Sequence, residues 1–89
     1  MILIYANGDC TFSLDEKPTL QSLQHAVGGY IEVLDLSPRW AMVINEEGKI
    51  EGLPVNYGAT TIAREHNALR GDDVIVGNAV IVHKTDMKR

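Results

Sequence analysis

The chain has 89 residues, a formal net charge of −4 and a single cysteine. A chain of this length is expected to form one domain over residues 1–89, with a core so small that association with other copies would add needed stability. Cys10 alone excludes an internal disulfide and a cysteine-rich zinc site. We therefore expect a homo-oligomer.

The distribution of charge and hydropathy argues against two classes of partner. The longest apolar run is far shorter than the roughly 20 residues of a membrane-spanning helix. The apolar start of the chain lacks the basic flank of a signal peptide. Basic residues gather only over 84–89, where a nucleic-acid-binding protein would show a larger patch. The sequence predicts a cytoplasmic protein that contacts neither membrane nor nucleic acid directly.

Two short strands are predicted at the N-terminus. An apolar run over 2–6 ends in Asn-Gly-Asp, which is a strong turn signal. The strict alternation that follows predicts a second strand with its apolar side packed, formed by Cys10, Phe12 and Leu14. Cys10 is accordingly interpreted as a small buried hydrophobe.

A first helix is predicted after Pro18, which a first helical turn tolerates. One packed face follows from the i, i+3, i+7 spacing of Leu20, Leu23 and Val27. Gly28 and Gly29 end this helix, because glycine adopts a left-handed conformation without a Cβ penalty.

Three more strands are predicted in the middle of the chain, over 30–36, 40–44 and 49–54. The last is expected at a sheet edge because of its proline. A turn joins the second and third, and Gly48 is expected to adopt a positive φ there.

The second helix is predicted after Asn56, which could cap its start. Its packed face would contain Ala59, Ile62, Ala63 and His66. Two β-branched runs close the chain, over 73–76 and 79–83. They are interpreted as a tight hairpin, with one long bulged strand as the alternative.

Most connections between these strands are too short for parallel crossovers. The predicted fold class is therefore α+β: a mostly antiparallel sheet or partly closed barrel of about six strands, with two short helices against one face.

The sequence contains no recognisable catalytic, metal or cofactor motif. His25, His66 and His83 lie on separate elements, and Cys10 has no local nucleophile signature. We therefore expect a binding protein without enzymatic activity.

Two polar blocks are the candidate ligand-binding regions. In the first, Gly28, Gly29 and Tyr30 precede Glu32, a mid-strand carboxylate that is expected on a wet face or, alternatively, buried with a partner. In the second, Asn56 and Thr60 surround a predicted helix start, where free N–H groups could hold an anion.

Four blocks together resemble a family catalogued as domain of unknown function 3846, found in bacteriophages, plasmids and bacterial chromosomes. The blocks span residues 23–32, 45–49, 52–60 and 73–80, within a similarity that runs from about Leu20 to Val82. The resemblance implies a small accessory protein and carries no catalytic residue over to this chain.

Two hypotheses follow for the function. The first is an oligomer that sequesters a small, nucleotide-type ligand to counter host defence. The alternative is an acidic protein that binds and inhibits a host nuclease or another host protein, for which a charge of −4 is mild. The expected partner is thus a small molecule or a host protein.

Overall fold

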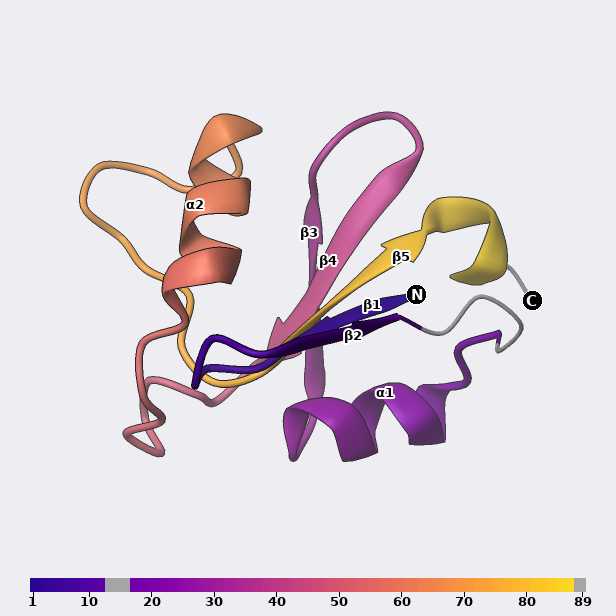
Figure 1. Ribbon diagram of the computed structural model, residues 1–89, viewed down its shortest axis with the longest axis horizontal. Helices are drawn as coiled ribbons and strands as arrows, with labels where there is room; N and C mark the ends of the chain where they lie inside the picture. The colour runs from indigo at the N-terminus through magenta and orange to yellow at the C-terminus, as the bar shows by residue number, and fades with distance from the viewer. Residues whose placement is uncertain (13–16, 88–89) are drawn as a thin grey trace.

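The computed structural model describes residues 1–12 and 17–87. Within these residues, five strands form one open antiparallel sheet in the order β2-β1-β5-β4-β3, accompanied by two α-helices (Figure 1). The elements are β1 Ile2–Ile4, β2 Cys10–Phe12, α1 Leu20–Val27, β3 Ile31–Asp35, β4 Trp40–Asn45, α2 Tyr57–Glu65, β5 Ala79–His83 and a 3-10 helix, Lys84–Met87. The α+β class and the antiparallel sheet are confirmed. The sheet is not closed, and five strands take the place of about six.

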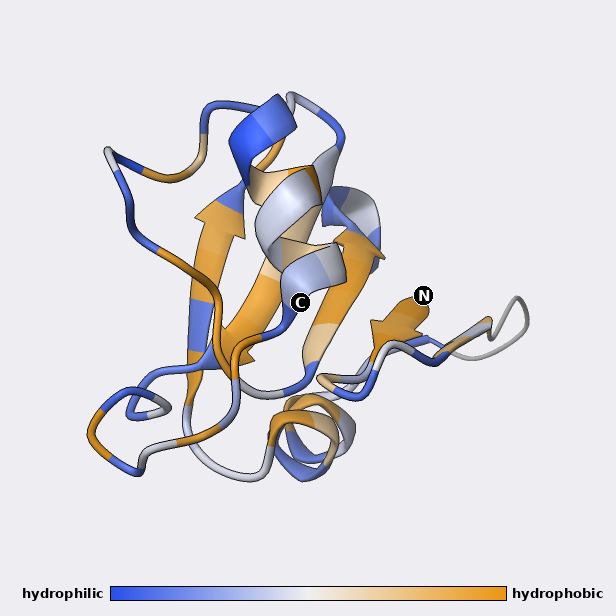
Figure 2. Cartoon of the chain, turned by 60° about the vertical axis from the view of Figure 1, so that its left-hand side comes forward, coloured by the Kyte–Doolittle hydropathy of each residue, from blue (hydrophilic) through white to orange (hydrophobic). Residues whose placement is uncertain are grey.

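The two helices cover opposite faces of the sheet, so the prediction that both cover one face is wrong. On one face, α1 packs with Leu23 and Val27 against a cluster that includes Val43. On the other, Ala59 and Ala63 of α2 pack against a cluster that includes Met42, Leu36, Ile75 and Ala79. Figure 2 shows hydrophobic colour along most of the central strands. Because successive side chains of a strand point to opposite faces, both faces are apolar and each needs its own cover.

Both helices begin at side-chain caps. Thr19 and Ser22 form a reciprocal capping box at the start of α1, so Pro18 precedes the helix. Gly28 ends α1 in the left-handed region with φ +81°, as predicted. Asn56 caps α2, also as predicted. In the described part of the chain, no helix is long and apolar enough to cross a membrane.

The packed side predicted for the second strand is wrong within the described residues, and Leu14 lies outside them. Cys10 and Phe12 are both exposed. The reason is position: β2 is an edge strand, and α1 packs against β3, β4 and β5 instead. Leu20 of α1 is likewise exposed, leaving Leu23 and Val27 as its buried residues.

No strand forms over 49–54 in the described structure, where the chain makes successive turns. The positive φ expected at Gly48 is also absent. Glycine is required there for a different reason, because a Cβ would lie 2.9 Å from Cγ2 of Val76.

Residues 73–76 form neither a hairpin with β5 nor one long strand with it. β5 already has a partner on each side, β1 and β4. The segment instead runs beside the entry to α2. There the Asn56 N–H donates to the Ile75 carbonyl at 2.8 Å, and the Gly77 N–H donates to the Pro54 carbonyl at 2.7 Å. This pairing lays the segment along one side of a groove on the α2 face.

Candidate functional site

A groove of about 340 Å³ opens on the α2 face of the sheet, on the side of β3. Its floor includes Leu34 of β3 and Ile44 of β4. The loops over 46–50 and 68–76 form its walls. Ala59 and Ala63 of α2 belong to the apolar cluster on this face, and the loops line the groove beside it.

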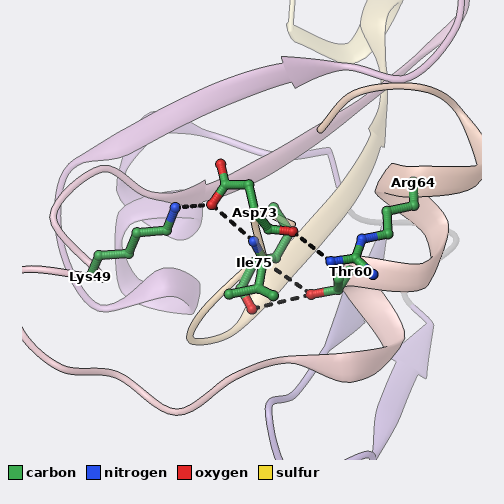
Figure 3. Close-up of polar contacts among 6 residues, drawn as sticks. Lys49, Thr60, Arg64, Asp73 and Ile75 are labelled. Carbon is green, nitrogen blue, oxygen red and sulfur yellow. Dashed lines mark hydrogen bonds and ion pairs between the residues drawn. The ribbon is translucent and has the colours of Figure 1, made fainter. Parts of the chain in front are cut away.

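The two walls are joined by an ion pair between Lys49 and Asp73. The same carboxylate accepts a hydrogen bond from the Val74 N–H at 2.9 Å. The Asp73 carbonyl accepts one from Nη2 of Arg64 at 2.9 Å, which ties the wall to α2 (Figure 3). These contacts stabilise the carboxylate form, so the Lys49 hydrogen bond, followed by that of Val74, lowers the pKa of Asp73.

Replacing Lys49 with methionine is expected to raise the pKa of Asp73 toward its ordinary value. Because the folded-state pKa is depressed, the pair stabilises the fold above the unfolded pKa of about 3.9. That stability is lost as the pH falls through the folded pKa. The pair is solvent-exposed, so the loss in Lys49→Met at pH 7 should stay below about 1 kcal/mol. Carboxyl NMR titration of both proteins measures the pKa, and an identical Asp73 titration would contradict the assignment.

Three other charged side chains line the groove: Glu32, Glu46 and Arg70. Within the described residues, these side chains make no hydrogen bond or ion pair, and all three residues are exposed. The groove therefore combines an apolar floor with acceptor and donor groups that are free to meet a ligand.

Of the residues predicted from the first polar block, only Glu32 lines this groove. Glu32 is exposed, in agreement with the expectation that it lies on a wet face. Gly29 and Tyr30 line a separate hollow, and Gly28 a third. Gly29 has a packing role, because a Cβ there would lie 3.0 Å from Nδ2 of Asn45. The structure does not bring the block together at one site.

The second polar block is buried. The Asn56 side chain is 1% exposed; its Oδ1 accepts from the Ala59 N–H at 3.0 Å, and its Nδ2 donates to the carbonyls of Ile4 and Gly77 at 3.0 and 2.9 Å. The Thr60 hydroxyl donates to the Asn56 carbonyl and accepts from the Ile75 N–H. All these groups are engaged inside the protein, and the N–H of Thr60 also bonds within α2. Both residues hold the fold together in this structure, away from the groove.

Sequence reasoning missed most of the groove. Its walls bring together loop residues that are far apart in the chain: Lys49, Ile50, Arg70 and Asp73. One available signal was Ile50, an apolar residue between two charged ones. Among the described residues, no group of three His, Cys, Asp or Glu is placed to hold a metal ion.

Residues 1–89 match the model of the family described as a domain of unknown function, DUF3846. No curated protein and no solved structure matches the chain. The match spans the whole sequence, and the chain therefore belongs to the DUF3846 family.

Proposed function

We propose that the protein binds a small ligand of the nucleotide class in the groove on the α2 face. The observation that carries this proposal is the juxtaposition of an apolar floor, Leu34 and Ile44, with unpaired charged groups of both signs. Ligand pockets in proteins are mostly apolar with a few polar groups that fix orientation, and they begin at about 300 Å³.

Each part of a nucleotide has a matching group in the groove. A base can lie on the apolar floor, while its N–H groups or a ribose hydroxyl donate to the Glu32 or Glu46 carboxylate. A phosphate would accept from Arg70, whose planar guanidinium suits bidentate contact.

Calorimetric titration with a panel of mononucleotides, cyclic nucleotides and ADP-ribose derivatives tests the proposal. Arg70→Gln should weaken binding of the best ligand by about tenfold or more, because a charged hydrogen bond contributes roughly 1.5–3 kcal/mol. Arg39→Gln is the matched control, since Arg39 is also exposed but lies outside the groove lining. Absence of binding across the panel, or equal loss in both variants, would contradict the proposal.

The cellular setting of this proposal is the cytoplasm of a host cell, where the bound ligand would be a signal made in host defence. An exposed free thiol at Cys10 fits a reducing compartment. The alternative of an acidic inhibitor has less support, because Lys49 and Arg70 interrupt the carboxylates around the groove.

A further inference from the structure

The outer edge of β3 has no strand beside it among the described residues. At one end of β3, the Leu36 N–H donates to the Trp40 carbonyl, and at the other the Tyr30 carbonyl accepts from the Glu46 N–H. Hydrogen-bonded and non-hydrogen-bonded pairs alternate along an antiparallel ladder. The residues whose N–H and C=O groups point away from β4 are therefore Ile31, Val33 and Asp35.

We propose that a second copy of this chain pairs antiparallel with this edge, about a twofold axis at Val33. In this register Val33 faces the partner's Val33, and Ile31 faces the partner's Asp35. The three outward residues of each copy then form three hydrogen-bonded pairs, with about six bonds in all. The two sheets become one, and the interface is closed and self-complementary, as in most homodimers.

The charges of β3 select this register. An axis at Glu32 would place two carboxylates directly opposite each other, which is destabilising. An axis at Leu34 would need the N–H of Ser37, which already donates to the Trp40 carbonyl at 3.2 Å. With the axis at Val33, Glu32 faces the partner's Leu34. The Asp35 carboxylate keeps its ion pair within the same chain, in which Nζ of Lys84 lies 2.7 Å from Oδ1 of Asp35.

The lengths of the two edge strands favour β3 over β2. Val33 lies at the centre of the five-residue β3 and is 46% exposed. The opposite edge, β2, has three described residues. An unprotected edge of this kind is a template for pairing with another chain.

The second copy also extends the groove. Glu32 and Leu34 are on the groove side of β3, and both line the groove. The partner's Leu34 would lie beside Glu32, so the apolar floor continues across the twofold axis.

Sedimentation velocity of the ligand-free chain at micromolar to hundred-micromolar concentrations tests the proposal independently of ligand binding. The wild type should sediment with the mass of two chains. Val33→Lys places two ammonium groups face to face at the axis and should raise the dimer Kd at least about tenfold. Val33→Pro removes the outward N–H, which an edge strand tolerates, and should act in the same direction. Phe12→Lys is the control: it adds the same charge to β2, where Phe12 is 68% exposed, and should leave the dimer intact.

Far-UV circular dichroism and urea midpoints establish that each variant is folded. A wild type that stays monomeric up to the highest concentration would overturn the proposal. So would a dimer that Phe12→Lys dissociates and the Val33 variants do not. Nucleotide titration of monomeric Val33→Lys separates the two proposals, because every groove residue of one chain is still present in that variant.

Discussion

Asn56→Ala is expected to lower the free energy of unfolding by about 2–4 kcal/mol. The substitution removes the cap of α2, which contributes about 1 kcal/mol. It also removes the Nδ2 donor from the buried carbonyls of Ile4 and Gly77, and each lost hydrogen bond contributes roughly 0.5–1.5 kcal/mol. Urea unfolding followed by circular dichroism, extrapolated linearly to water, gives the difference.

Two further variants separate the cap from the internal bonds. Asn56→Asp retains an acceptor for the Ala59 N–H but sets a carboxylate against two carbonyl oxygens, so it should be at least as destabilising as Asn56→Ala. Thr19→Ala removes the solvent-exposed cap of α1 and should cost about 1 kcal/mol. If Asn56→Asp were nearly as stable as the wild type, the cap of α2 alone would account for the stabilising contribution of the Asn56 side chain.

The role of Asn56 explains why a polar residue can look like a binding residue in sequence. Its side chain joins three separate parts of the chain: the start of α2, the end of β1 and the bend at Gly77. A side chain amide has enough donors and acceptors to do so, and burial then requires that all of them be used. Sequence indicates the polarity of this residue and its capping position, but the two distant carbonyls depend on the tertiary fold.

The same distinction separates the elements that periodicity predicts from those it does not. Both helices follow from local spacing and β2 from strict alternation, while β1, β3, β4 and β5 follow from apolar or β-branched runs. The runs over 49–54 and 73–76 have strand-like residues but join no strand of the described sheet, since β5, the partner expected for 73–76, is already paired with β1 and β4. A β-strand forms only where a neighbouring strand pairs with it, and the composition of one segment does not identify that neighbour.

Of the groove, sequence identifies one exposed carboxylate, Glu32, on the correct strand. The cationic side chains are missed because Lys49 and Arg70 reach the groove through loops whose paths local patterns do not determine. Helix spacing likewise reveals that α2 has one apolar face, but it does not reveal which side of the sheet that face covers.

Met42→Ala is expected to cost about 2–5 kcal/mol, because a fully buried methionine in a central strand leaves a cavity when truncated. Met42 lies opposite Leu34 on the neighbouring strand, on the same face as α2 and the groove. The variant should therefore shift the methyl NMR signals of Leu34 and Ile44 as well as lower the urea midpoint.

Val43→Ala is the matched comparison, one residue further along β4 and equally buried, but packed against α1. It should cost about 2 kcal/mol and shift the methyl signals of Leu23 and Val27, while those of the groove change less. If both variants perturbed the same methyl groups to the same extent, the two faces of the sheet would not be independent. The expected separation has a functional consequence: the face that carries the groove can change its side chains while α1 and its cluster continue to stabilise the sheet from behind.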